Sequence, residues 1–259
     1  MGMRMPSFEV SMILVILTFL SLNKEGSTAT FLDYYCSNTP TFTPNSTFQS
    51  NLAQLLSSLS SNARCKDGYY NNTVGENTAD AVYGLFVCRG DLTVQDCVDC
   101  VAGGTQDLSL QYCVRGKQAV ISYEECMLRY SDEYFFSNMN TQPSLYQLTK
   151  YNLSDPARFN QLLMATTNGL VSRVSNAGIS GAKKFATKEA NFTGSQILYT
   201  LEQCTPDISS SDCSKCIQEG ITLMQECCSG YQGARIMFPS CRIRFELYQF
   251  YRMLNIVTN

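Results

Sequence analysis

Apolar side chains recur at helical spacing in two stretches of the chain, one in each half. In the first stretch they are Phe48, Leu52, Leu55, Leu56 and Leu59. In the second stretch they are Phe159, Leu162, Leu163, Leu170, Val171 and Val174. Residues three and four apart share one face of a helix, and a continuous apolar face normally packs against a core. The pattern therefore predicts an amphipathic helix in each half.

A second helix in each half is predicted from capping residues. Thr93 precedes Asp96 by three residues, and Ser209 precedes Asp212 by the same spacing, which is typical of an N-terminal capping box. Short apolar and aromatic runs predict strands at residues 81–87, 118–123, 134–136, 197–199, 234–238 and 247–251. Two helices against an antiparallel sheet form a common layered arrangement, so each half is predicted to be an α+β domain.

The two halves are copies of one domain. Shifted by 116 residues, segment 91–100 aligns with segment 207–216, and at a shift of 115 residues 126–130 align with 241–245. Internal matches of this density indicate a duplication. The polar, proline-containing segment 137–144 is the predicted linker. The predicted domains therefore span residues 30–136 and 145–253, and we expect them to pack into one unit.

The first 29 residues have the pattern of a secretory signal peptide. Arg4 precedes an apolar run at 12–20, and Ser27 and Ala29 are spaced like a signal-peptidase site. We expect a soluble extracellular protein that begins at Thr30 and has no membrane span, because no later apolar stretch is long enough to span a bilayer. Four asparagines lie in glycosylation sequons that fit this compartment: Asn45, Asn71, Asn152 and Asn191.

Thirteen cysteines indicate a disulfide framework, because exported chains are oxidised. The spacing C-x8-C-x2-C begins at Cys88 and again at Cys204. The last two cysteines of each motif share one face of the predicted helix and could join it to two strands. A four-sulfur zinc site would need pairs from both repeats, and a redox C-x-x-C pair would need a thioredoxin-like context. Neither a metal nor another cofactor is therefore predicted.

These motifs resemble those of a known family. The doubled C-x8-C-x2-C spacing, the run Tyr83–Cys88, the segment Glu125–Tyr130 and the pair at 227–228 resemble plant cysteine-rich repeat secretory proteins and the ectodomains of cysteine-rich receptor-like kinases. Each repeat is similar to the ginkbilobin-type antifungal domain. The resemblance implies two helices on a five-stranded antiparallel sheet in each domain. It also implies the disulfides Cys36–Cys113, Cys88–Cys97, Cys100–Cys126, Cys204–Cys213 and Cys216–Cys241.

The second copy departs from the family pattern. Tyr151 stands where its first cysteine is expected, so Cys228 loses its partner, and Cys65 and Cys227 are additional. Because the total is odd, at least one thiol is free or bonded to another chain if the others are bridged. Which of these three cysteines it is stays open, and a bond between the adjacent Cys227 and Cys228 would close a strained ring.

The resemblance further implies a mannose-type site in the second copy. Its three positions hold Asn152, Arg235 and Glu246. A guanidinium, a carboxylate and an amide together offer donors and acceptors to sugar hydroxyls. The last two positions hold Val120 and Ser131 in the first copy, so no such site is expected there. An ion pair between Arg235 and Glu246 across adjacent strands is the structural alternative.

Composition narrows the function further. The net charge of −3 does not favour nucleic acid, and the absence of histidine excludes Ser-His-Asp and Cys-His catalysis. Glu124 and Glu125 are neighbours on a predicted strand and would point to opposite faces, which makes them a poor glycosidase pair.

We therefore expect a non-enzymatic recognition protein of stress, defence or growth signalling. Its expected partner is an extracellular protein, such as a receptor-like kinase ectodomain, or a mannose-containing glycan. A direct antifungal mannose-binding protein is the alternative.

Plant-expressed protein is expected to begin near Thr30 and to carry N-glycan on at least one sequon, because the signal-like segment and the sequons both point to export. Intact mass before and after enzymatic deglycosylation measures both. An unglycosylated species that retains Met1 would contradict the extracellular assignment.

Overall fold

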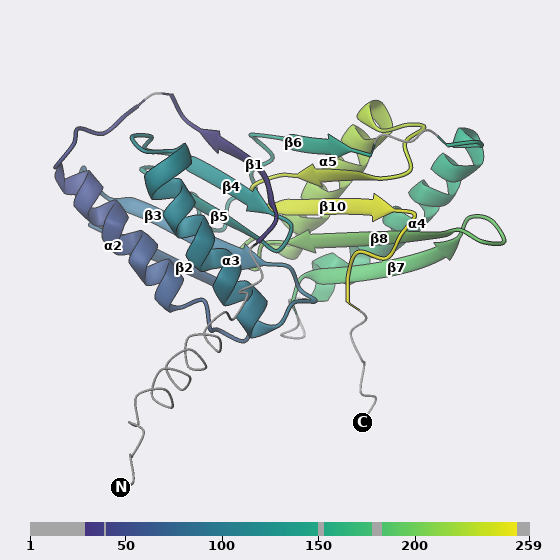
Figure 1. Ribbon diagram of the computed structural model, residues 1–259, viewed down its shortest axis with the longest axis horizontal. Helices are drawn as coiled ribbons and strands as arrows, with labels where there is room; N and C mark the ends of the chain where they lie inside the picture. Colours follow the sequence, from purple (N-terminus) through teal and green to yellow (C-terminus); the bar gives the residue numbers. More distant parts are fainter. Residues whose placement is uncertain (1–28, 39, 150–152, 178–182, 253–259) are drawn as a thin grey trace, which may run out of the picture.

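The computed structural model describes residues 29–38, 40–149, 153–177 and 183–252 and shows two α+β domains (Figure 1). Within these residues each domain packs two α-helices on a five-stranded antiparallel sheet, as the sequence predicts. The strand orders are β1-β4-β5-β3-β2 and β6-β9-β10-β8-β7. The duplication therefore extends from the sequence to the topology, because every strand of the first sheet has a counterpart in the second.

The first domain consists of β1 (Phe31–Cys36), α2 (Thr47–Ser61), β2 (Tyr69–Val74), β3 (Val82–Cys88), α3 (Val94–Asp107), a π-helical turn η1 (Leu108–Tyr112), β4 (Ala119–Tyr123) and β5 (Cys126–Ser131). The second domain consists of β6 (Leu145–Leu148), α4 (Pro156–Ala177), β7 (Phe185–Asn191), β8 (Ile197–Cys204), α5 (Ser210–Cys227), β9 (Ala234–Met237) and β10 (Cys241–Glu246).

The helices follow the sequence pattern closely. Helix α2 buries all five apolar side chains of its stripe, and in α4 the stripe is buried except at Leu162 and Val171, which are half-buried. Thr93 and Asp96 bond to each other's backbone N–H in a full capping box, and Ser209 accepts from the backbone N–H of Asp212. Among the described residues, no helix has the length and apolarity that crossing a bilayer requires.

Two of the predicted strands are wrong. Strand β5 ends at Ser131 and β10 ends at Glu246, so residues 134–136 and 247–251 form loops. Phe135 and Phe136 fold back onto the surface of the first sheet that faces away from the helices. In the second domain Tyr251 packs edge-on against Tyr199, with ring centroids 6.0 Å apart. These loop residues are aromatic because they pack against the face of a sheet. Their composition therefore resembles that of a strand, although they do not extend the sheet.

Disulfides tie one helix of each domain to two adjacent strands. Cys88 and Cys126 lie opposite each other on β3 and β5, and they bond to Cys97 and Cys100 of α3. The second domain repeats this arrangement with Cys204–Cys213 and Cys216–Cys241, and Cys36–Cys113 joins β1 to the segment after η1. These are the five pairs that the family resemblance implies. Each such bridge contributes about 2–4 kcal/mol by restricting the unfolded chain.

The structure assigns the three cysteines whose pairing the sequence leaves open. Cys227 and Cys228 are bonded to each other at the end of α5, despite the strain that sequence analysis associates with adjacent cysteines. Cys65 is the one cysteine without a disulfide, and its thiol donates to the carbonyl oxygen of Tyr69. The odd cysteine therefore belongs to the first domain.

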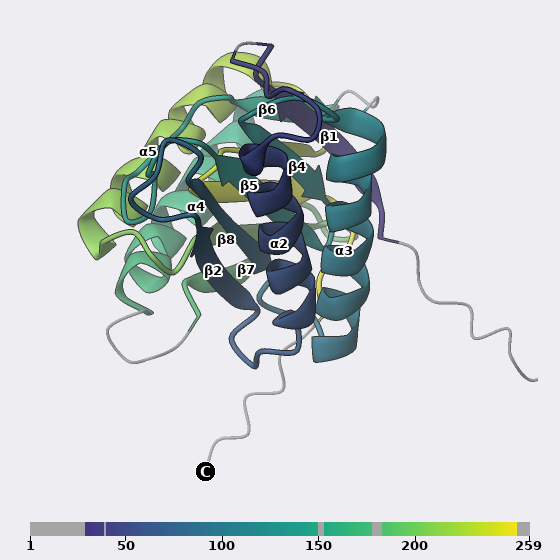
Figure 2. The same cartoon turned by 90° about the vertical axis from the view of Figure 1, so that its left-hand side faces the viewer.

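The two domains contact each other through sheet surfaces that face away from their helices. Figure 1 shows α2 and α3 in front of the first sheet and α4 and α5 behind the second, and Figure 2 shows the same order from the end of the molecule. The Gln203 side chain of β8 donates to the Cys88 carbonyl oxygen at 2.8 Å. Gly90 lies so close to Phe185 that a Cβ there would be 2.3 Å from the Phe185 ring. The domains are therefore in direct contact, as expected.

One carboxyl group lies inside the second core. Glu202 of β8 is fully buried, and neither carboxylate oxygen has a hydrogen-bond partner among the described residues. Its neighbours across the sheet are Ala186 and Ile243, both apolar. At the shift of 116 residues its counterpart is Phe86, a buried member of the first core. Burial raises the pKa of Glu202 to about 8, so the carboxyl group is mostly protonated at neutral pH.

Glu202→Gln is expected to remove a pH dependence of stability. The folded state holds the Glu202 proton up to about pH 8, whereas the unfolded state releases it near 4.5, so stability falls as pH rises between these values. At pH 8 the variant should be more stable than the wild type by roughly 1–3 kcal/mol, and the difference should vanish at pH 4. Urea unfolding across this range measures it. The exposed Glu219→Gln on α5 is the control, and equal pH profiles for wild type and Glu202→Gln would contradict the assignment.

Candidate functional site

The two described residues of the predicted mannose-type site, Arg235 and Glu246, are paired with other residues. Arg235 lies on β9, Glu246 ends β10, and Asn152 lies outside the described residues. The alternative ion pair between Arg235 and Glu246 is not formed. Arg235 pairs instead with Glu124 of the first domain at 3.2 Å, and Glu246 accepts from Arg244 at 3.0 and 3.1 Å.

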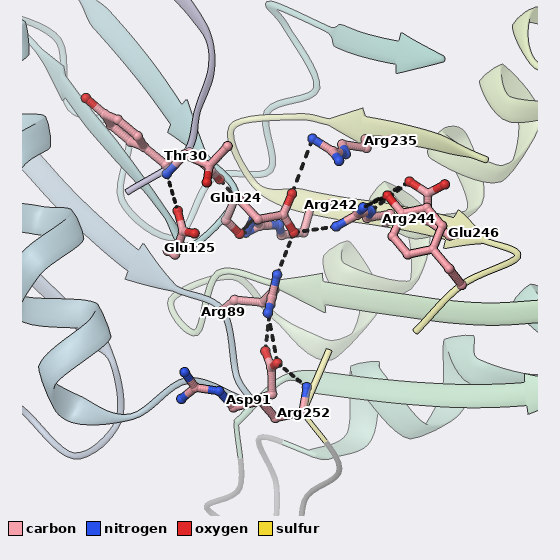
Figure 3. Close-up of polar contacts among 12 residues, drawn as sticks. Thr30, Arg89, Asp91, Glu124, Glu125, Arg235, Arg242, Arg244, Glu246 and Arg252 are labelled. Carbon is pink, nitrogen blue, oxygen red and sulfur yellow. Dashed lines mark hydrogen bonds and ion pairs between the residues drawn. The ribbon is translucent and has the colours of Figure 1, made fainter. Parts of the chain in front are cut away.

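Glu124 is the centre of this arrangement. It lies in the turn between β4 and β5 rather than on a strand, which corrects the sequence expectation for Glu124 and its neighbour. Its carboxylate forms an ion pair with Arg89 of its own domain, at 2.5 Å. It also pairs with Arg235 and Arg244 of the second domain (Figure 3). Its backbone carbonyl oxygen also accepts from Arg242 at 2.9 Å. One acidic residue of the first domain therefore binds four arginines, three of them from the second.

The pKa values of Glu124 and Glu246 are shifted in opposite directions. Burial alone would raise the pKa of Glu124, but Arg244, Arg242, Arg235 and Arg89 together lower it below its ordinary value. Burial raises the pKa of Glu246, and the nearby arginines do not overcome that effect. Glu124 is thus a firmly ionised group, because it is surrounded by positive charge on several sides.

The closing segment of the second domain is also attached to the first. Arg89 forms a bidentate ion pair with Asp91, with N···O distances of 2.6 and 2.9 Å. Asp91 also accepts a hydrogen bond from the backbone N–H of Arg252 at 2.8 Å. The Arg252 side chain contacts Asp96 at 2.6 Å. Figure 3 shows this chain of contacts running from Glu124 down to Arg252. The network therefore spans both domains.

The donors and acceptors of the network are largely used by one another. The side chain of Glu246 is only 2% exposed and that of Arg235 is 21% exposed. Glu246 also lies against Gly233, where a Cβ would be 1.8 Å from its carboxylate oxygen, so a larger residue there would displace the carboxylate. Arg235 uses its Nη1 group for both Glu124 and Gln147, at 3.2 and 3.4 Å, so a sugar would have to approach its remaining N–H groups beside these partners. The geometry is that of a junction between domains, and nothing in it resembles a nucleophile beside a general base.

An exposed aromatic cluster lies elsewhere on the first domain, and sequence analysis missed it. Phe31 stacks on Tyr112 with ring centroids 4.9 Å apart, and Tyr34 contacts Tyr112 at 4.5 Å. Phe31 is 39% exposed and Tyr34 is 41% exposed, both on the outermost strand β1. We call Phe31, Tyr34 and Tyr112 the β1 aromatic cluster. The signal was the aromatic content of residues 31–35, which the strand prediction did not include.

The described sequon asparagines differ in accessibility. Asn45 and Asn191 are exposed. Asn71 is half-buried on β2, and its amide donates to the Tyr69 hydroxyl at 2.9 Å. Asn152 is outside the described residues. Asn45 and Asn191 are therefore the best-placed acceptors for N-glycan.

Comparison with known proteins identifies similar chains. The profile of a family described as salt stress response/antifungal matches residues 35–133 and 146–248. Cysteine-rich receptor-like protein kinase 25 of Arabidopsis thaliana is 42% identical over 94% of this chain, which spans only 36% of that kinase. The antimicrobial ginkbilobin-2-like protein of Castanea crenata is 33% identical, with 93% of this chain and 96% of that protein covered.

A solved structure shares the fold. The tandem DUF26 ectodomain of the cysteine-rich receptor-like protein PDLP8 of Arabidopsis thaliana superposes with a TM-score of 0.75 at 23% identity. The match covers 86% of this chain and all of that ectodomain. Both domains of this chain therefore have the DUF26 ectodomain fold.

Glu124→Gln is expected to weaken the junction between the domains. The amide keeps the size of the side chain but leaves the Arg89, Arg235 and Arg244 guanidinium groups without their shared counter-charge. Breaking one side of such a buried cluster costs about 3 kcal/mol of unfolding free energy. Chemical unfolding at pH 7 measures the loss.

The control is Glu125→Gln at the adjacent turn position, where the side chain accepts only from the backbone N–H of Thr30 among the described residues. Because the pKa of Glu124 is lowered in the folded state, its contribution is present above about 4.5 and disappears as pH falls. The gap between the Glu124→Gln protein and the wild type should therefore narrow as pH falls below about 4.5. Equal stability of both Gln variants at pH 7 would contradict the role of Glu124.

Proposed function

Since the chain belongs to the salt stress response/antifungal family, we propose that it is an exported, non-catalytic recognition protein of the plant apoplast. Its role in this proposal is in stress, defence or growth signalling, after removal of residues 1–29. Its proposed partner is an extracellular protein, such as the ectodomain of a receptor-like kinase. Similarity to receptor-like kinases over most of this chain supports a shared extracellular role.

The β1 aromatic cluster is the observation that carries this proposal. Phenylalanine and tyrosine are enriched at the centres of protein interfaces, because each buries a large rigid surface at little entropic loss. Phe31 and Tyr34 present such surface on the outermost strand β1. The Tyr34 N–H donates to the Asp33 carboxylate and the Leu32 carbonyl oxygen accepts from Gln147, so a partner would dock mainly by ring packing.

A mannose-type glycan is the second candidate ligand, through Asn152, Arg235 and Glu246. It is favoured by the similarity to an antimicrobial relative and by the partial exposure of Arg235 at the junction. In this candidate the protein is a direct antifungal agent. Binding would place sugar hydroxyls at the remaining N–H groups of Arg235, and these contacts would be weaker than the ion pair with Glu124 because hydroxyl acceptors are neutral.

Surface-binding measurements against purified ectodomains of cysteine-rich receptor-like kinases from one plant test the main proposal. Tyr34→Ala should weaken binding to the cognate ectodomain at least tenfold, or about 1.4 kcal/mol, because a central aromatic contact is lost. Tyr134→Ala is the matched control, since Tyr134 is an exposed tyrosine of the same domain outside the cluster.

A parallel titration with yeast mannan tests the second candidate. Binding of mannan that is lost in Arg235→Ala, with no ectodomain bound, would replace the main proposal by the antifungal one. Ectodomain binding that is unchanged by Tyr34→Ala would show that the β1 aromatic cluster is not the docking surface.

A further inference from the structure

A polar recess lies between the first sheet and the segment that leads into the second domain. Its cavity volume is about 260 Å3, close to the lower end of the range for a small-ligand site. One wall is the sheet surface that faces away from α2 and α3, with Tyr35 of β1 and Arg129 and Ser131 of β5. Gln118 lies just before β4, and Asn140 faces it from the connecting segment.

The repeat shows what is unusual about Arg129. At the shift of 115 residues, Arg129 corresponds to Arg244, and Ser131 corresponds to Glu246. In the second domain the Arg244 guanidinium pairs with Glu246 and with Glu124. In the first domain the serine cannot supply a carboxylate. Among the described residues the Arg129 guanidinium has neither a hydrogen-bond acceptor nor an ion pair.

Arg129 is nevertheless held in place and remains charged. Its guanidinium lies 4.0 Å from the centre of the Phe135 ring, which fixes the plane of the group. Burial lowers its pKa to about 10, with the charge of Asp207 acting in the opposite direction. At neutral pH the recess therefore contains a positioned cation whose N–H donors are unused. A planar guanidinium fork matches a carboxylate better than any other common anion except phosphate.

Two neighbouring side chains keep one polar group each for a ligand. Gln118 donates through its amide nitrogen to Asp132 at 3.0 Å, which leaves its amide oxygen as an acceptor. The Ser131 hydroxyl accepts from the backbone N–H of Glu133 at 3.0 Å, which leaves its own proton as a donor. These groups are neutral and of the kind that bind sugar hydroxyls.

Asn140 on the opposite wall and Tyr35 at the rim also offer groups to a ligand. The Asn140 amide oxygen accepts from the backbone N–H of Gln142 at 2.8 Å, which leaves the amide N–H groups available. Tyr35 is 42% exposed and presents a ring at the edge of the recess. An aromatic ring beside neutral amides and a hydroxyl favours a sugar ring over a peptide, because both the apolar face and the hydroxyls of a sugar find partners.

We propose that this recess binds a uronate residue of an acidic oligosaccharide. The sugar carboxylate takes the place at Arg129 that Glu246 takes at Arg244, and Tyr35 packs on the sugar ring. The site is separate from the β1 aromatic cluster and from Arg235 and Glu246. A test of this proposal is therefore independent of the proposed function.

Calorimetric titration of the full mature protein with a galacturonate hexamer tests the proposal. Binding should be measurable and should weaken with added salt, because a charge pair forms in a partly open site. The fully methyl-esterified hexamer has the same length and ring shape but no charge, and it should bind at least tenfold more weakly.

Arg129→Gln should reduce affinity for the acidic hexamer at least tenfold, and Tyr35→Ala should also reduce it. Arg173→Gln is the matched control, because it removes an exposed arginine of α4 in the other domain. Thermal unfolding of each variant verifies folding. Tyr35→Ala keeps the test valid if Arg129→Gln fails to fold, since Tyr35 is exposed at the rim.

Three results would overturn the proposal. The first is absence of binding at millimolar hexamer. The second is equal affinity for the acid and its methyl ester, which would show that the carboxylate is not recognised. The third is binding of a short peptide through its C-terminal carboxylate with no binding of the hexamer, which would assign the recess to a protein ligand.

Discussion

The relative placement of the two domains depends on one ionised carboxylate in a turn. Glu124 is held at the end of β4, and arginines of β9 and β10 converge on its carboxylate and its carbonyl oxygen. Without it, the guanidinium groups of Arg89, Arg242 and Arg244 would repel one another across the junction with one fewer counter-charge. The close approach of Gly90 to Phe185 and the bond from Gln203 to Cys88 both require that the sheets stay in this position.

Duplication supplied one template, and the two copies then used the same positions for different purposes. The cysteines that join helix to sheet are retained in both copies. On the sheet surface that faces away from the helices, the first copy has Val120 and Ser131 where the second has Arg235 and Glu246. The second copy directs its polar groups at the first domain, whereas the first copy leaves Arg129 facing a recess. The charged pattern of one copy is thus used within the molecule, and that of the other is available to a ligand.

Local patterns predicted those parts of the structure that depend on local physics. The α2 stripe and the Thr93 capping box were predicted because helical spacing and capping act over a few residues. The edge strands β2 and β7 were missed because they are only partly buried, and they contain Asn71, Asn72, Lys188 and Glu189 instead of an apolar alternation. The partner of Arg235 was missed because Glu124 lies in the other domain. No pattern within one repeat indicates which distant acid an arginine will meet.

The connectivity of the disulfides has a consequence for biosynthesis. Every bridge joins cysteines of the same domain, and the three bridges of the first domain are complete with Cys126. The first cysteine of the second domain, Cys204, is synthesised much later. Because domains fold from the N-terminus as the chain emerges, the first domain can oxidise fully before the second offers a competing thiol. Of the cysteines made before Cys204, only Cys65 then remains reduced, so the order of synthesis itself limits mispairing between two nearly identical cysteine patterns.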